Sequence, residues 1–128
     1  MSCACEACRK ECERRPGWFA PGEAIRAIEA GHADRLTIVV DHAGVPAIAP
    51  IGDGPFGFIG RCTFFKNDRC EIHDSGFKPI ECRMGYICKQ ASIPETAVYR
   101  MWKTRLGRQA LSMLRLAKGD NSQEKEFV

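Results

Sequence analysis

Several features that define common protein classes are missing from this sequence. It has no run of about twenty apolar residues, the length that a transmembrane helix needs, so we expect no membrane span and no membrane partner. No apolar stretch follows the first methionine, so we expect no signal peptide and a cytoplasmic location. The sequence also has no phosphate-binding Gly-Lys-Ser/Thr loop, no His-Glu-x-x-His motif and no paired-glycine dinucleotide fingerprint. These absences exclude the best-known nucleotide-binding and zinc-protease motifs and leave the question of enzymatic activity open.

The excess of positive over negative charge in the sequence is also small. Nineteen basic and sixteen acidic residues give a formal net charge of +3, which is too weak to indicate nucleic acid binding by itself. The length of 128 residues fits one domain. We expect residues 1–118 to form a cysteine-cluster domain and residues 119–128 to form a flexible tail.

Cysteine is the residue that the sequence has in excess. Eight cysteines fall into two blocks, and residues 13–61 between the blocks contain none. In a reducing compartment, cysteines do not form lasting disulfides and are either free thiols or metal ligands, so we favour metal ligation over disulfides. The candidate metal ligands are all eight: Cys3, Cys5, Cys8, Cys12, Cys62, Cys70, Cys82 and Cys88.

The ligand type narrows the metal to two alternatives. Cys5 and Cys8 have the Cys-x-x-Cys spacing that brings two sulfurs to one ion. Both a zinc ion and an iron–sulfur cluster accept four thiolates, so the expected cofactor is one or the other. Four thiolates carry more negative charge than one zinc ion neutralises, and nearby cations would offset it. The candidates are Arg9, Lys10, Arg61, Arg69 and Arg83. His73 follows Cys70 by three residues and is the best of three histidine candidates, whereas His32 and His42 are interpreted as surface residues.

The order of the cysteine motifs carries a family resemblance. After Cys5-x-x-Cys8 and Cys12, the chain continues with Cys62-Thr63-Phe64-Phe65, Cys70-Glu71-Ile72-His73 and Lys78-Pro79-Ile80-Glu81-Cys82-Arg83. This order resembles the YkgJ-type cysteine-cluster family, described as zinc- or iron-chelating domains, over roughly residues 3–88. The chain departs from the family in having no adjacent Cys-Cys pair, in Lys78 for arginine and in His73 for tyrosine. The resemblance implies metal binding more strongly than any reaction.

The local patterns predict a small α+β domain stapled by metal. Pro21-Gly22 begins a short N-terminal helix that Gly31 ends, and the β-branched run at residues 36–40 predicts a strand. A second short strand is expected at residues 47–51, and a short antiparallel hairpin at residues 62–73. Ser-x-x-Glu at residues 92–95 predicts the start of one long C-terminal helix of about 23 residues, which continues to near Lys118.

The C-terminal helix has an apolar stripe and six basic residues. No acidic residue stands between Glu95 and Asp120. The helix could bind a protein partner or a second copy of the chain, or it could bind nucleic acid. We favour packing of the stripe, with the basic side chains as solvated surface. The basic residues are Arg100, Lys103, Arg105, Arg108, Arg115 and Lys118.

Three functional hypotheses follow from these patterns. The first is a metal-binding protein, with zinc or an iron–sulfur cluster on cysteine-ligated sites and no assigned biological role. The second is an iron–sulfur enzyme, or a subunit of one, in redox or protein-modification chemistry. The third is a nucleic-acid accessory protein that uses the basic C-terminal helix.

Overall fold

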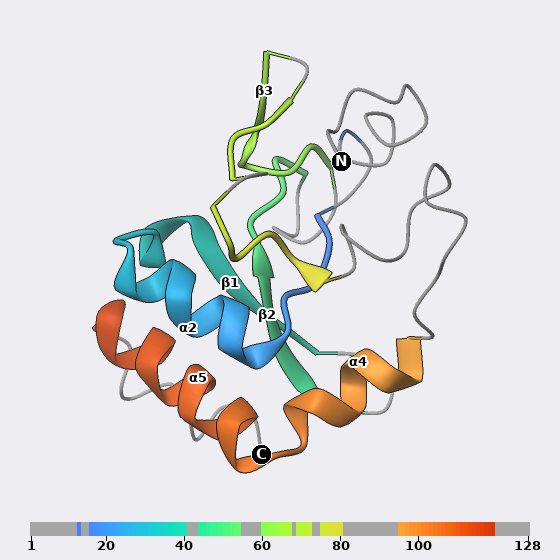
Figure 1. Ribbon diagram of the computed structural model, residues 1–128, viewed down its shortest axis with the longest axis vertical. Coiled ribbons are helices and arrows are strands. Elements are labelled where there is room, and N and C mark those ends of the chain that lie inside the picture. The colour runs from blue at the N-terminus through green and yellow to red at the C-terminus, as the bar shows by residue number, and fades with distance from the viewer. Residues whose placement is uncertain are drawn as a thin grey trace.

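Helices and two small antiparallel sheets make up the computed structural model (Figure 1). The structure describes Glu13 and residues 16–40, 44–54, 60–67, 69–72, 75–80 and 95–119. Within these ranges the chain is a small α+β fold, as the sequence predicts. None of the helices that the structure describes is long and apolar enough to cross a membrane.

The first sheet is the antiparallel pair of β1 (Leu36–Val40) and β2 (Pro46–Pro50). The β-branched run predicts β1 correctly, and the short second strand lies one residue earlier than expected. Both prolines of β2 stand at its ends, where a missing N–H costs the least. Ala47, Ile48 and Ala49 are all buried, so β2 lies inside the core.

Helix α2 (Pro21–Glu29) begins and ends where the sequence predicts. Pro21 occupies the first position, and the side chain of Glu23 reaches back to accept the N–H of Ala20 at 2.8 Å. Gly31 has a φ of 93°, the left-handed conformation that commonly ends a helix. The helix buries Ala24 and Ala27 and packs against α5.

The single long C-terminal helix is divided into two. Helix α4 (Glu95–Trp102) and helix α5 (Arg105–Ala117) are separated at Lys103 and Thr104. The hydroxyl of Thr104 accepts the N–H of Gly107 at 3.1 Å and donates to the carbonyl of Met101 at 2.7 Å. These bonds start a new helix instead of continuing the old one. The expected Ser-x-x-Glu start at residues 92–94 lies outside the described residues.

The apolar stripe of the C-terminal segment has eight residues, of which four are buried: Val98, Trp102, Ala110 and Leu114. Ala117 is exposed. Trp102 is 2% exposed, and its Nε1 donates to the carbonyl of Phe19 at 2.8 Å. The N–H of Phe19 in turn donates to the carbonyl of Ile48 in β2 at 3.1 Å. Phe19 therefore joins α4 to the first sheet. Leu106, which the stripe includes, is instead 46% exposed.

The second sheet is the short pair of β3 (Phe65–Lys66) and β4 (Arg69–Cys70). Asn67 takes a φ of 53° in the turn, as expected for the polar tip of a hairpin. The paired part is shorter than the predicted hairpin at residues 62–73. In Figure 1, β3 and the turn between α4 and α5 lie at opposite ends of the molecule.

Candidate metal centre

Two of the eight candidate ligands, Cys62 and Cys70, lie within the described residues. The other six, Cys3, Cys5, Cys8, Cys12, Cys82 and Cys88, lie outside them, and so do His42 and His73. Among the residues that the structure describes, no three His, Cys, Asp or Glu side chains form a group that could hold a metal ion. The structure therefore describes the backbone and the neighbouring side chains around two cysteines of the second block, Cys62 and Cys70.

The backbone on both sides of Cys62 is fixed to the end of β2. Cys62 forms an isolated bridge with Gly52, and the N–H of Thr63 donates to the carbonyl of Ile51 at 2.8 Å. On the other side, a carboxylate oxygen of Asp53 accepts the N–H of Arg61 at 2.8 Å. Cys62 itself is 8% exposed. Its thiol is therefore presented from a backbone that the first sheet positions.

Gly60 permits this close approach of two chain segments. It has a φ of 92°, and a Cβ atom there would lie 2.5 Å from the Asp53 carboxylate and 2.6 Å from the backbone nitrogen of Gly54. A side chain at position 60 would thus be both strained and blocked. This glycine sets the turn that leads into Cys62.

Cys70 stands on β4, half-buried, with Phe65 as its partner in the ladder. A regular hairpin over residues 62–73 would bring Cys62 beside Cys70, but the ladder places Phe65 opposite Cys70 instead. The reason is a tight turn in which the N–H of Phe65 donates to the carbonyl of Cys62 at 2.9 Å. The two chain segments that carry these cysteines are still hydrogen-bonded to each other, because the N–H of Glu71 donates to the carbonyl of Phe64 at 2.7 Å.

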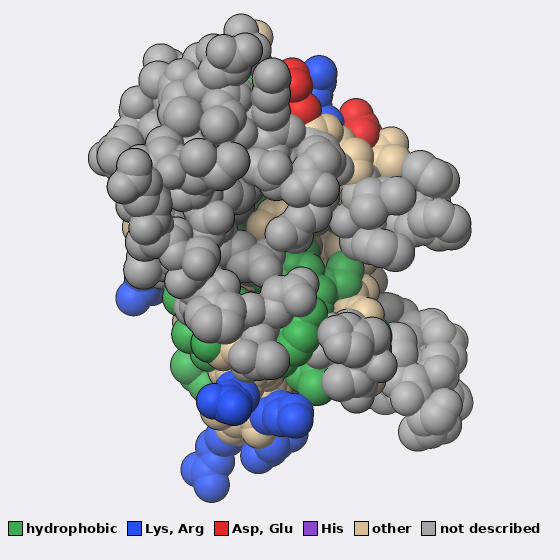
Figure 2. All heavy atoms as spheres, turned by 90° about the vertical axis from the view of Figure 1, so that its right-hand side faces the viewer, with side chains coloured by type: hydrophobic (Ala, Val, Ile, Leu, Met, Phe, Trp, Pro, Cys, Tyr) green, Lys and Arg blue, Asp and Glu red, His purple; other side chains and the backbone are tan. Residues whose placement is uncertain are grey.

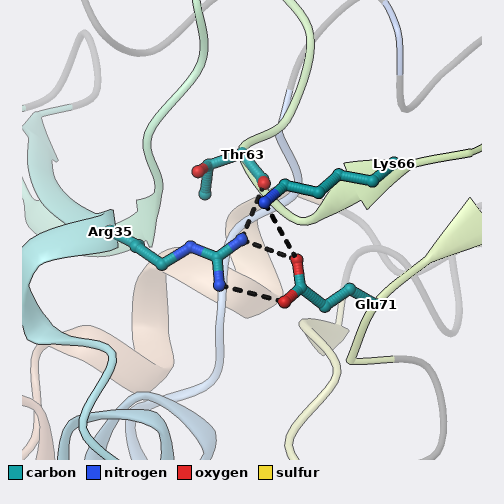
Figure 3. Close-up of polar contacts among 4 residues, drawn as sticks. All are labelled: Arg35, Thr63, Lys66 and Glu71. Atoms are coloured by element: carbon teal, nitrogen blue, oxygen red, sulfur yellow. Dashed lines mark hydrogen bonds and ion pairs between the residues drawn. The ribbon is translucent and has the colours of Figure 1, made fainter.

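An ion pair ties this hairpin to the first sheet (Figure 3). Arg35, at the end of the 3₁₀ turn η1 (Ala33–Arg35), donates to both carboxylate oxygens of Glu71, at 2.6 and 3.1 Å. The same guanidinium donates to the carbonyl of Thr63 at 2.9 Å and lies 4.3 Å from the ring centre of Phe64. Lys66 approaches Glu71 at 3.9 Å. Arg35 thus contacts both strand segments that carry the cysteines.

The ion pair shifts the pKa of both partners. The hydrogen bond from Arg35 is the main cause that lowers the pKa of Glu71, with smaller contributions from the charges of Arg35, Lys66 and His32. The hydrogen bond to Glu71 raises the pKa of Arg35, and the charge of Cys62 adds to this. The charge of Cys62 is the smallest of the causes, so the pair with Glu71 dominates the electrostatics of Arg35.

Two further residues near the second block differ from what the sequence indicates. His32, interpreted as a surface residue, is half-buried, and its ring packs edge-on against Phe64 at 5.4 Å and against Phe77 at 5.8 Å. Lys78, which replaces an arginine in the family pattern, is 5% exposed. A lysine is rarely buried to this extent unless it is paired.

The cations near the candidate site were only partly foreseen. Arg61 is exposed, and its guanidinium lies 3.8 Å from the carboxylate of Glu13. Arg35 was missed because its partner Glu71 is 36 positions away, and no local pattern connects them. The predicted strand at residues 36–40 begins directly after Arg35, but it gives no indication of a partner for this residue.

Comparisons with protein-family models, with curated proteins and with solved structures find no match. The resemblance to the YkgJ-type family therefore stays a prediction from the motifs quoted above. The chemistry of the site has to be argued from its residues.

Proposed function

We propose that this protein binds a zinc ion or an iron–sulfur cluster through cysteine thiolates drawn from both blocks. The observation that carries the proposal is the grouping of eight cysteines into two blocks of four. Cysteines placed for core packing alone would have no reason to cluster in this way. Thiolates are the preferred ligands of both metal centres.

The surroundings of the second block support this proposal. Cys62 and Cys70 are held on a short, hydrogen-bonded segment, and Arg35 donates to the carbonyl of Thr63, the residue next to Cys62. Thiolate centres are stabilised by neighbouring cations and N–H donors. Arg35 supplies such a cation, and the buried Lys78 precedes Cys82 by four residues. These residues would position the ligands and offset their charge when the metal is bound.

We further propose that the two blocks share a site. The first block has one Cys-x-x-Cys pair and the second has none, so neither resembles a complete zinc ribbon. A shared site would tie the N-terminal block to the hairpin frame around Cys70. Metal binding would then contribute to folding, because ligands from irregular segments converge only when the metal holds them.

Anaerobic purification followed by elemental analysis tests the proposal. We expect between one and two metal sites per chain. An iron–sulfur cluster gives a brown protein with visible absorption, whereas a zinc protein is colourless. Four disulfides with no metal, shown by mass spectrometry, would refute metal binding.

A pair of variants tests the role of the hairpin cysteine. Cys70→Ser should lower the metal content, because it removes a thiolate ligand. Lys66→Ser changes an exposed residue on the neighbouring strand and should leave the metal content unchanged. Equal metal content in both variants would exclude Cys70 as a ligand.

A further inference from the structure

Four basic side chains surround the turn between α4 and α5, and all four are exposed. Figure 2 shows Lys and Arg side chains gathered at the lower end of the molecule, where Figure 1 places this turn. We refer to these residues as the basic turn: Arg100, Lys103, Arg105 and Arg108.

The break between the helices lies among these charges. Four cations stand within nine consecutive positions, 100–108, on both sides of one connection. In one continuous helix, the rotation of 100° per residue would direct Arg100 and Arg105 about 140° apart around the axis. The interruption at Lys103 and Thr104 removes this constraint, because α5 starts afresh after the turn.

The positive charge of Arg105 is expected to destabilise its own helix. Arg105 is the first residue of α5, and the first turn of α5 contains no acidic residue. The N-terminal end of a helix carries partial positive charge and favours carboxylates over cations. The charge of Arg105 therefore does not contribute to the stability of α5.

Among the described side chains, these four charges take no part in an ion pair. The apolar stripe packs inward through Val98, Trp102 and Leu114, which are all buried. Packing of the stripe and exposure of the cations therefore concern different faces, so the first does not exclude a binding role for the second.

The chemistry of the turn fits phosphate groups of a duplex better than other anions. Three of the four cations are arginines, whose planar guanidinium binds phosphate through two hydrogen bonds. Single-strand binding relies on exposed aromatic rings, but Trp102 is buried and Tyr99 packs on Trp18 at 5.2 Å. A membrane surface requires a broad apolar face, and Leu106 is the one large apolar side chain exposed at the described turn.

We propose that the basic turn binds the phosphate backbone of a nucleic acid duplex without reading its base sequence. This inference does not depend on the proposed metal site. Of its candidate ligands, Cys70 stands on β4, which pairs with β3 at the opposite end of the molecule in Figure 1.

Fluorescence anisotropy with a labelled duplex of mixed sequence, about 20 base pairs long, tests the proposal on the full chain. If each of the four cations neutralises one phosphate, the logarithm of the affinity should fall with the logarithm of the salt concentration with a slope of about −3.6. Affinity should then weaken about 150-fold between about 50 and 200 mM salt.

Matched double variants separate the basic turn from net charge. Arg105→Gln with Arg108→Gln should weaken binding at low salt by at least about tenfold and halve the slope to about −1.8. Lys66→Gln with Lys118→Gln removes the same charge from exposed positions outside the turn and should change affinity by less than about threefold. Arg100→Gln with Lys103→Gln provides a second test of the turn if the first pair fails to fold by circular dichroism.

Several results would overturn the proposal. These are no duplex binding at about 50 mM salt, or an equal loss of binding in the turn and control variants. Tighter binding to a single strand, to phosphatidylserine vesicles or to polyglutamate than to the duplex would assign the turn to another class of partner and reject this one.

Discussion

Gly107→Ala is expected to have two opposing effects on the stability of the chain: a gain in helix propensity and a steric clash with the backbone of Trp102. Gly107 is buried in the first turn of α5. An ideal Cβ there would lie 2.6 Å from the carbonyl oxygen of Trp102 and 2.8 Å from its carbonyl carbon and Cα. Because these are backbone atoms of a buried residue, α4 and α5 would have to move apart.

The magnitudes decide the direction of the effect. Alanine in a helix is favoured over glycine by about 1 kcal/mol. Overpacking against a fixed backbone costs about 1–3 kcal/mol. Displacing Trp102 would also weaken its hydrogen bond to Phe19, which contributes about 1 kcal/mol. We therefore expect the free energy of unfolding to fall by about 1–3 kcal/mol in total.

Thermal unfolding followed by circular dichroism measures this change. For a chain of this size, 1 kcal/mol corresponds to about 4 °C, so the Tm should fall by about 4–12 °C. Gly22→Ala is the matched control, because Gly22 is also helical and a Cβ there meets nothing within 4 Å. The control should be neutral or slightly stabilising. A Tm for Gly107→Ala at or above that of the parent chain would show that α5 adapts freely, and the reasoning would be wrong.

Three further predictions concern the hairpin and the basic turn. Because the pKa of Glu71 is lowered by Arg35, the stability from this pair is present above the ordinary value of 4.5 and is lost as pH falls through the folded pKa. Glu71→Gln should therefore lower the free energy of unfolding by up to about 1 kcal/mol at neutral pH. In urea titrations, the free energy of unfolding of this variant should fall less steeply in acid than that of the parent chain; an unchanged dependence on pH would contradict this. Arg105→Gln should stabilise the free chain by about 0.3–1 kcal/mol, since it removes a cation from a helix N-terminus, and a lower Tm would refute this. Chelation of the metal should reduce hydrogen-exchange protection in residues 62–72 before residues 105–117, whereas equal loss would show that the whole domain depends on the metal.

Local signals were sufficient for the first half of the fold. The β-branched run at Leu36–Val40 has no competing pattern, and β1 occupies these residues. Pro21 and Gly31 act through φ angles that each residue sets by itself, so α2 has the expected ends. Where one residue decides the backbone, the sequence alone is informative.

The interrupted C-terminal helix shows the limit of periodicity. Apolar residues continue at helical spacing from Trp102 to Leu106 and Ala110, so the pattern gives no reason for a break. The break depends on the hydroxyl of Thr104 and on the contact of Gly107 with the Trp102 backbone. Both interactions join residues five positions apart or fewer, so the signal for the break is local. The apolar stripe conceals it, because its spacing is the same with or without a break at Thr104.

The sequence predicts cysteine ligands for the candidate site, which stay a prediction, and it gave no indication of the contacts around them. Cysteine identity and spacing are local properties, and they pointed to the second block before any fold was known. The pair of Arg35 with Glu71 and the packing of His32 on Phe64 join segments more than thirty residues apart. Such contacts follow from how the hairpin docks on the first sheet, which no short motif specifies.

The two proposed surfaces are connected through the core but do not overlap. On one side, Cys62 is fixed through Gly52 to the end of β2. On the other, the indole of Trp102 bonds the carbonyl of Phe19, whose own N–H bonds Ile48 within β2. Strand β2 is thus common to both, while the cations of the basic turn make no described ion pair with the hairpin. Because β2 pairs with β1 and packs on α2 and α5, we expect a disturbance at the hairpin to have little effect on the basic turn.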